Sequence, residues 1–584
     1  MFNLLFAALS CAAPALFSEP LAHETISSAT VVADRGVVAS RQDTVLVNPV
    51  NPATSALLAL PALQISDYGG AGGLKSVSLR GLGVTHTSFY VDGLRVGNVQ
   101  SGQADLGSFE IENTSSISVD YAQNSVELTT ARPTFAEGLR YLTDAFIAYG
   151  SFNTLQAFAK YSYKLSERTS VSAHLSGLST DGDFPYGKDL KRSNNDLRQY
   201  RGGVDIFGRD WHVKAGINDA ERGTPGSTTY PGTDRQQDRN SFVQGTYRQL
   251  LSPLYEVKLS ARAAADDLLY KSDWGEDEYK QKELQLNSTQ LFHTAPWLDL
   301  SLTADWWWDS LESSLYDGGR NTVLAGAAAL FKLERLQASA GLRWTLAYDR
   351  HADTRKPLEP QMQLRYQLPL GFELTAFARR AYRLPTFNEL YYPGYGNPEL
   401  KAEDARLYDA GIQWFDEVGK WSLTAKLDGF YNDLRDKITS APTPSDPSIW
   451  LPFNVGHLKV PGADASFSAR YGGAEFALGL TAHYSYLGED VPYTPRSSAS
   501  IGGDCKYKGW SAELLWALRG SNKDAYGGRY EGWNTVDLTL CRALFRDRLV
   551  VSVIGRNLFD YRYMVVNGYP MQGRSLLLAL KTSF

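Results

Sequence analysis

The sequence predicts a membrane all-β protein, in which a closed antiparallel transmembrane β-barrel follows a smaller α+β domain at the N-terminus. Three observations predict this fold. Strand-length segments alternate apolar and polar residues along most of the chain, and the final segment has leucines on one face and ends at Phe584. In addition, no segment after Phe17 approaches the ~18 uninterrupted apolar residues of a membrane helix. Barrel strands cross a bilayer with about 10 residues, apolar only toward lipid, so they leave no long hydrophobic run.

Composition narrows the classes of function. The 584 residues carry a formal net charge of -6, and 12% of them are aromatic. An acidic chain without a basic field does not suit nucleic acid, which we exclude as a partner. The three cysteines have no His or Cys at zinc-ligand spacing, so the sequence predicts neither a structural zinc site nor a disulfide framework.

The N-terminus predicts export. Residues 4–17 form an apolar run that is too short to span a membrane and that lies where the core of a signal peptide belongs. We therefore expect a signal peptide over residues 1–22, although no Lys or Arg precedes the run. A lipoprotein site at Cys11 is the alternative, with Ala8 at a position where Leu is usual.

The region 136–584 is the predicted barrel. From Trp421 to Asn432, apolar and polar residues alternate, which gives one lipid-compatible face and one mostly polar face. Similar alternation recurs along the region, with aromatic residues at strand ends, where membrane girdles lie. The length suits about 22 strands of about 20 residues each, connections included. A soluble β-sandwich is the alternative, but it would not keep this pattern over so long a region.

The last strand provides a further signal. Leu576, Leu578, Leu580 and the terminal Phe584 lie on one face of it. This pattern resembles the C-terminal sorting signal of bacterial outer-membrane barrels, whose closing strand ends in an aromatic residue. The alternative is an ordinary edge strand, which would expose an aggregation-prone apolar face in a soluble protein.

Two strand-and-turn motifs mark the N-terminal domain, which we place at residues 36–135. Arg80-Gly81 follows one short strand, and Asp92-Gly93 ends the next in a tight turn. The pair resembles the plug domain of TonB-dependent outer-membrane receptors, and residues 100–107 resemble the form found in Bacteroidetes-type receptors. Taken separately, the two motifs would be unrelated turns of a surface domain.

The barrel region contains two more motifs of this family. Residues 382–392, followed by 396–403, resemble its "YRxPtxxeLy…GNPxLkpE" signature, and residues 556–563 resemble its near-terminal "xNLfdxxY". The run from Tyr391 to Leu400 resembles that of the vitamin B12 (cobalamin) receptor subgroup, and the compact size of the chain is similar to the size of these receptors. The resemblance covers nearly the whole mature chain.

The resemblance implies a multi-pass barrel in the bacterial outer membrane, surrounded by its lipid, that takes up a scarce solute and is not an enzyme. A TonB box in the 23–35 linker would contact the TonB–ExbB–ExbD complex by strand addition. We expect this box at Glu24, Thr25, Ile26, Ser27, Ser28, Ala29 and Thr30. A surface lipoprotein is a further expected partner. The alternatives are a ferric-siderophore or other iron-chelate receptor and, from another class, a non-transporting barrel such as an adhesin.

The expected ligand is a corrinoid such as vitamin B12. Heme is disfavoured because no His lies between Arg383 and Asn397, where heme receptors of the family usually have one. The candidate ligand-binding residues are His86, Tyr391, Tyr392 and Asn397. For His86 the alternative is a structural hydrogen bond, and for Asn397 it is a role in barrel architecture.

No cofactor is expected apart from Ca²⁺ in external loops. Asp181, Asp183 and Asp189 cluster hard oxygen donors of the type that binds this ion, but their spacing is not that of an EF-hand. An acidic loop exposed to solvent is the alternative.

Overall fold

A computed structural model describes residues 42–47, 57–60, 62–350, 354–443, 449–473, 475–524 and 527–584. In this part of the chain, no helix has both the length and the apolar character needed to span a membrane. The predicted signal peptide (1–22) and the linker with the TonB box (23–35) lie outside the described residues. These two assignments therefore stay predictions.

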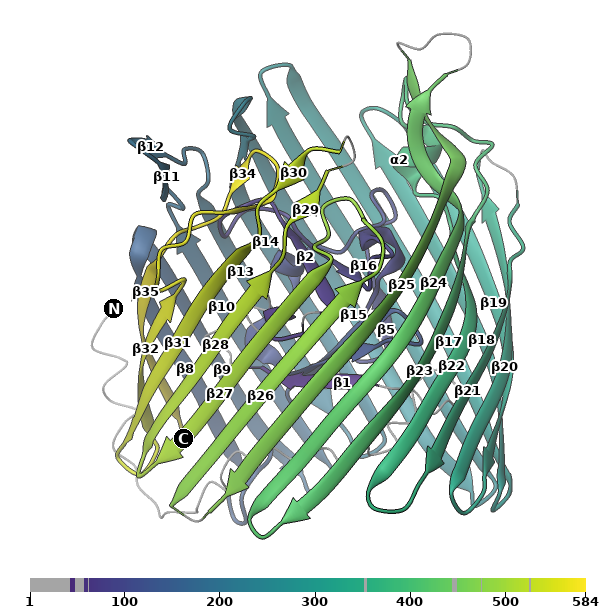
Figure 1. Cartoon of the computed structure of the whole chain (residues 1–584), viewed down its shortest axis with the longest axis vertical. Coiled ribbons are helices and arrows are strands. Elements are labelled where there is room, and N and C mark those ends of the chain that lie inside the picture. The colour runs from purple at the N-terminus through teal and green to yellow at the C-terminus, as the bar shows by residue number, and fades with distance from the viewer. Residues whose placement is uncertain are drawn as a thin grey trace.

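Within the described residues, twenty-two strands close into one antiparallel barrel (Figure 1). Neighbours in the barrel follow one another along the chain, and β35 pairs with β8 to close it. This confirms the predicted fold class and strand number. The strands are β8 Tyr141–Gly150, β9 Thr154–Ser166, β10 Thr169–Thr180, β13 Leu197–Phe207, β14 Trp211–Gly226, β15 Pro231–Ser252, β16 Tyr255–Ser272, β17 Gly275–Ala295, β18 Leu298–Ser313, β19 Gly318–Lys332, β20 Leu336–Asp349, β21 Leu358–Gln367, β22 Phe372–Arg383, β23 Glu403–Val418, β24 Trp421–Pro442, β25 Trp450–Gly472, β26 Phe476–Leu487, β27 Ser497–Tyr507, β28 Trp510–Arg519, β31 Trp533–Leu544, β32 Leu549–Arg556 and β35 Ser575–Ser583.

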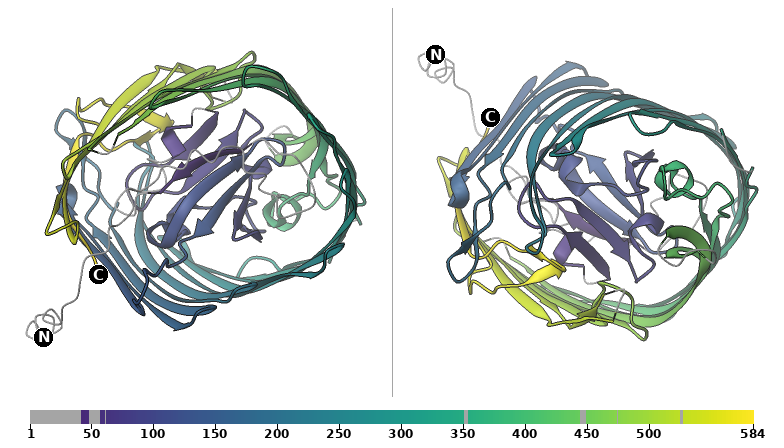
Figure 2. Two further views of the ribbon diagram at one scale, coloured as in Figure 1. Left: turned by 90° about the horizontal axis from the view of Figure 1, so that it is seen from below. Right: turned by 90° about the horizontal axis from the view of Figure 1, so that it is seen from above.

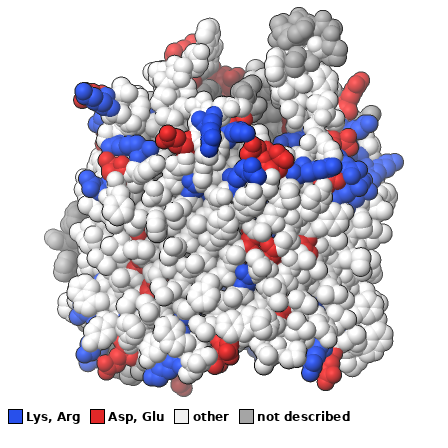
Figure 3. All heavy atoms as spheres, viewed as in Figure 1, with Lys and Arg blue, Asp and Glu red and all other residues white. Residues whose placement is uncertain are grey.

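The wall has an apolar outer face and a polar inner face. In β24, Leu427 is 55% exposed on the outside, whereas the next residue, Asp428, is 3% exposed inside the lumen. On the face seen in Figure 3, acidic and basic residues gather along the upper and lower rims and are sparse between them. This distribution is that of a barrel wall in contact with lipid.

The two ends of the barrel differ in their connections. At the lower end of Figure 1 the strands join through short turns, such as residues 253–254 between β15 and β16. At the upper end the connections are longer and include 181–196, 384–402 and 557–574. Outer-membrane barrels have short periplasmic turns and long extracellular loops, so the upper end is the external end.

A small domain fills the lumen (Figure 2). Its five-stranded sheet has the order β1-β6-β7-β4-β5, and β2 and β3 form a separate hairpin. Apolar residues from these elements form its core. The predicted tight turn joins β4 to β5, with φ of 52° at Asp92 and 82° at Gly93. The elements are β1 Gln42–Leu46, β2 Leu63–Asp67, β3 Lys75–Leu79, η1 Val84–His86, β4 Ser88–Val91, β5 Leu94–Val96, η2 Leu106–Ser108, η3 Ile111–Asn113, β6 Thr114–Asp120 and β7 Ser125–Thr130.

Phe584 lies at the seam of the barrel. Its backbone N–H donates to the carbonyl of Thr143 at 2.9 Å, and its carbonyl accepts from Thr143 N–H at 2.8 Å. The residue is 45% exposed. The seam explains a structural role for the last residue, while its role as a sorting signal stays a prediction.

If the outer face of the wall contacts lipid, a charge should destabilise the barrel more on the outer face of a strand than on its inner face. Leu427→Arg places a charge on the outer face of β24 and should cost about 2–4 kcal/mol if it lies near the bilayer midplane. Thr424→Arg places the same charge on the polar face and should cost much less. Denaturant titration of the heat-modifiable band on gels measures both changes, and equal losses would contradict the assignment.

Candidate functional site

Arg80 joins the N-terminal domain to the barrel wall. It follows β3 with φ of 48° and is 4% exposed. Its Nη1 donates to Oδ2 of Asp409 in β23 at 2.7 Å, and its Nε donates to Oδ2 of Asp464 in β25 at 2.8 Å. The guanidinium therefore bridges two carboxylates of the wall.

Aromatic rings and a backbone contact complete the Arg80 site. The guanidinium carbon lies 4.3 Å from the ring centre of Tyr121 and 4.4 Å from that of Phe430. Nδ2 of Asn432 donates to the carbonyl of Arg80 at 3.1 Å. Burial opposes the charge, but Asp464 and Asp409 outweigh it and raise the pKa of Arg80. Arg80 thus stays a cation inside the lumen, and the Arg-Gly motif serves to attach the two domains.

His86, a predicted ligand residue, is part of a second attachment. Its Nε2 pairs with Oε2 of Glu403, and its side chain is only 6% exposed. Glu403 also accepts from Nη2 of Arg383 at 2.6 Å and from the backbone N–H of Ile438 at 2.6 Å. The structure therefore gives His86 the structural hydrogen bond that we considered as the alternative, and it does not bring His86 into the cavity described below.

The 382–392 motif forms a short helix against the N-terminal domain. Helix α2 (Phe387–Tyr391) begins with a capping box between Thr386 and Glu389. The backbone N–H groups of Phe387 and Asn388 donate to the carbonyls of Val99 and Gln100 at 3.1 and 3.0 Å. Phe387 is fully buried. The motif therefore contacts the loop at the upper end of the N-terminal domain.

The remaining predicted ligand residues lie at the C-terminal end of this helix and in the loop after it. The ring of Tyr391 contacts those of Phe387 and Tyr316, with centroids 5.6 and 6.4 Å away. Tyr392 is 37% exposed. Nδ2 of Asn397 donates to the carbonyl of Pro452 at 2.9 Å, which ties the 384–402 loop to the external end of β25. Asn397 thus has a contact of the architectural kind, and a ligand role for the two tyrosines stays a prediction.

Glu110 attaches the domain to the opposite part of the wall. Its Oε2 lies 2.9 Å from Nζ of Lys214 in β14, and its Oε1 lies 3.3 Å from Nε2 of His174 in β10. Burial raises the pKa of Glu110, but Lys214 and His174 outweigh this and lower it to about 2. Glu110 is therefore ionised at neutral pH and holds this side of the domain.

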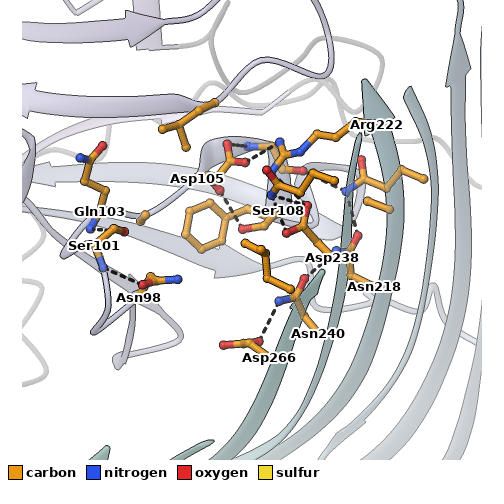
Figure 4. A pocket seen from close by; sticks show the side chains of 18 of the residues that line it. Asn98, Ser101, Gln103, Asp105, Ser108, Asn218, Arg222, Asp238, Asn240 and Asp266 are labelled. Carbon is orange, nitrogen blue, oxygen red and sulfur yellow. Dashed lines mark hydrogen bonds and ion pairs between the residues drawn. The ribbon is translucent and has the colours of Figure 1, made fainter. Parts of the chain in front are cut away.

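Between these attachments lies a cavity of about 580 Å³ (Figure 4). Residues of the N-terminal domain form one side of it, and most of the opposite side comes from β13, β14, β15, β16 and β17. Its volume lies within the range of about 300–1,000 Å³ found for small-molecule sites. The cavity is the candidate ligand site.

The basic side chains that line the cavity already have acidic partners. Arg222 lies 3.0 Å from both Asp105 and Asp238, and Arg262 lies 3.2 Å from Glu283. The third, Lys214, pairs with Glu110. In the described lining, carboxyl groups outnumber these three basic groups. The lining is thus rich in carboxyl groups, and each of its three basic groups already has a carboxyl partner, so the cavity does not suit an anion.

A row of side-chain amides crosses the wall of the cavity. Gln199 donates to Asn218, Asn218 donates to Asn240, and Asn240 donates to Oδ1 of Asp266, each at 2.8 Å. We call these four residues the amide row. Because Nε2 of Gln199 also donates to the carbonyl of Gly107 at 3.1 Å, the row connects four strands to the N-terminal domain. It offers both donors and acceptors to a bound molecule.

Sequence analysis missed the residues of the cavity. Alternation assigns Asn218, Asn240 and Asp266 to a polar face, but it does so equally for most strands. Only the position of the N-terminal domain in the lumen selects the strands that line the cavity.

The predicted calcium ligands are not brought together. Asp183 pairs with Lys191. Among the described residues, no group of three or more His, Cys, Asp or Glu side chains is placed to hold a metal ion. A calcium site at Asp181, Asp183 and Asp189 stays a prediction that this arrangement does not support.

Comparisons with known proteins agree with this architecture. The family model "TonB dependent receptor-like, beta-barrel" matches residues 89–558, and "TonB-dependent Receptor Plug Domain" matches residues 34–132. A protein named vitamin B12 transporter BtuB from Vibrio vulnificus is 24% identical, over 92% of this chain and 90% of that protein. Its namesake from Photobacterium profundum is 29% identical over 37% of this chain and 36% of its own length. The solved siderophore receptor PirA from Acinetobacter baumannii is 14% identical, covers 93% of this chain and 98% of its own, and has a TM-score of 0.74, which shows the fold alone.

The Arg80 site makes a testable prediction. Arg80→Ala leaves Asp409 and Asp464 buried without their cation, which should destabilise the docked N-terminal domain by about 3–5 kcal/mol. Urea titration monitored by ion conductance in planar bilayers measures the displacement of the N-terminal domain, because the lumen conducts ions once this domain has left it. Arg80→Lys keeps the positive charge but cannot donate to both carboxylates as the guanidinium does, so we expect a smaller loss of stability than for Arg80→Ala. An unchanged midpoint for Arg80→Ala would contradict the assignment.

Proposed function

Because the chain belongs to the TonB-dependent receptor family, we propose that it takes up a corrinoid such as vitamin B12 across the outer membrane. Members of this family are outer-membrane receptors and transporters, not enzymes. The N-terminal domain is their plug, and it occupies the lumen, so solute cannot diffuse through freely. A non-transporting adhesin is therefore excluded as the function.

The chemistry of the cavity supports a corrinoid. A corrinoid presents carboxamide groups around its ring, and each of these groups both donates and accepts hydrogen bonds. The amide row and the carboxylates beside it supply the matching acceptors and donors. The full-length relative named as a vitamin B12 transporter supports the same substrate class. The cavity lined by carboxyl and amide groups is the single observation on which this proposal rests most.

An iron chelate is the second candidate. The likeness of the fold to a solved siderophore receptor supports it. Many ferric siderophores are anions, however, and the basic groups of the cavity lining are already paired with carboxylates. The cavity therefore favours a neutral or cationic ligand over such an anion.

The proposed transport cycle uses the cavity and the attachments of the plug. Solute would enter from the external end and occupy the cavity between the plug and β13–β17. Release toward the periplasm requires the plug to move, which means loosening attachments such as those of Arg80 and Glu110. We assign this work to the TonB–ExbB–ExbD complex acting on Glu24 to Thr30, outside the described residues. A surface lipoprotein partner and the Bacteroidetes-type likeness of residues 100–107 also stay predictions.

Binding of cyanocobalamin to the purified protein tests the substrate. Asn240→Ala interrupts the amide row and should weaken binding about tenfold, which corresponds to about 1.4 kcal/mol. Asn287→Ala is the matched control, since Asn287 accepts from Nε1 of the plug-facing Trp307 but does not line the cavity. Absent cyanocobalamin binding alongside tight ferric-siderophore binding would overturn the corrinoid proposal and leave the receptor family unaffected.

Deleting Glu24 to Thr30 tests the energy coupling. Uptake of labelled cyanocobalamin by cells should be lost, while binding to the same cells should remain, because the segment is proposed to meet TonB and not the solute. Uptake that survives the deletion would place the TonB contact in another segment.

A further inference from the structure

The outer face of β24 fixes the height of the lipid belt on one side of the barrel. Its outward residues from Trp421 to Tyr431 cover eleven positions, which agrees with the 9–11 residues of a transmembrane strand. Tyr431 is 37% exposed, and its ring centre lies 6.3 Å from that of Tyr408 on β23. Aromatic side chains mark membrane interfaces. Tyr408 and Tyr431 therefore mark the external edge of the lipid belt.

Charged residues follow directly beyond that edge. On β24, the next outward positions after Tyr431 are Asp433 and Arg435. On β23, the outward positions before Tyr408 are Arg406 and Asp404. The strand register places Arg406 opposite both Arg380 of β22 and Asp433, and it places Asp433 opposite Lys459 of β25. These strands lie side by side in Figure 1. We call Arg380, Asp404, Arg406, Asp433, Arg435 and Lys459 the outer-wall cluster.

The two aspartates hold the arginines in place. Asp404 accepts from Nε and Nη2 of Arg380, both at 2.8 Å, and lies 3.6 Å from Nη2 of Arg406. Asp433 accepts from Nε of Arg435 at 2.9 Å and contacts Nε2 of His457 at 2.6 Å. The two aspartates together do not neutralise the cluster, because it has four basic side chains and only two carboxylates. The cluster therefore has excess positive charge.

The basic side chains remain accessible from outside. Arg380 is 39% exposed, Arg406 34% and Arg435 46%. A guanidinium has five N–H donors, so an arginine paired with a carboxylate still has donors for a phosphate. Arg406 contacts Asp404 only at 3.6 Å, so its donors are the ones most available to a phosphate. The combination of this charge with the apolar wall below it matches an amphiphile with an anionic head.

We propose that the outer-wall cluster binds the phosphate of a phosphorylated lipid in the outer leaflet, with its acyl chains against Tyr408, Tyr431 and Leu427. Charge complementarity identifies the headgroup, and the position at the edge of the lipid belt identifies a lipid as the occupant. The site lies on the outer wall, apart from the solute cavity in the lumen. It is independent of which solute the receptor takes up.

Native mass spectrometry of the detergent-solubilised protein tests the proposal. Phosphatidic acid, which carries a phosphomonoester, should bind at least tenfold more tightly than phosphatidylcholine, and inorganic phosphate should compete only weakly. Arg406→Gln with Arg435→Gln should abolish most of this preference. The matched control is Arg239→Gln with Lys280→Gln, which removes two exposed cations that each have one acidic partner. The control should keep the preference.

Each other outcome contradicts the proposal. Equal loss in the control pair would indicate a diffuse charge effect, and full competition by inorganic phosphate would indicate a simple anion site. An unchanged preference in the Arg406 and Arg435 variant would exclude the cluster. If the double variant does not form the heat-modifiable barrel, the single variant Arg435→Gln replaces it, and a reduced preference for phosphatidic acid is expected there too. An unmodified protein without preference for phosphatidic acid overturns the proposal.

Discussion

The Arg80 guanidinium, buried between Asp409 and Asp464, is the interaction on which the assembly depends. A barrel of this size has a lumen too wide for its own side chains to fill, so it would be an open channel without the second domain that occupies it. That domain contacts a polar wall, where hydrophobic packing alone cannot determine its position. Charge pairing can do so, because a buried cation at the wrong height or rotation would lose its carboxylates at a cost of several kcal/mol.

Other contacts hold the plug at further points of the wall. Glu110 meets Lys214 on a different part of the wall, and α2 contacts the loop that includes Val99 and Gln100. Together these contacts hold the plug against the barrel and leave the cavity lined by carboxyl and amide groups between the plug and β13–β17. The geometry of the cavity therefore depends on the position of the plug. A motion that breaks the attachments also changes the binding site, which couples release of solute to work done on the plug.

The sequence predicts the barrel well because its alternation is a local property. Leu427 and Asp428 fall on opposite faces as expected, and the turn at Asp92-Gly93 forms where predicted. The site is harder to predict, because it depends on which side chains a domain brings together across the lumen. His86 lies between the two plug motifs, which makes it a ligand candidate from sequence, but its pairing with Glu403, distant in sequence, cannot be predicted from local pattern. Asn240 and Asp266 gave no signal, since many lumen-facing residues are polar.

The most direct measurement of the central claim is a structure of the protein with cyanocobalamin bound. The account predicts density for the corrinoid in the cavity, with its carboxamides within hydrogen-bond distance of Asn240 and Asp266 and with Arg80 still between Asp409 and Asp464. Density for the corrinoid at another place in the barrel, or an empty cavity at saturating cyanocobalamin, would contradict it.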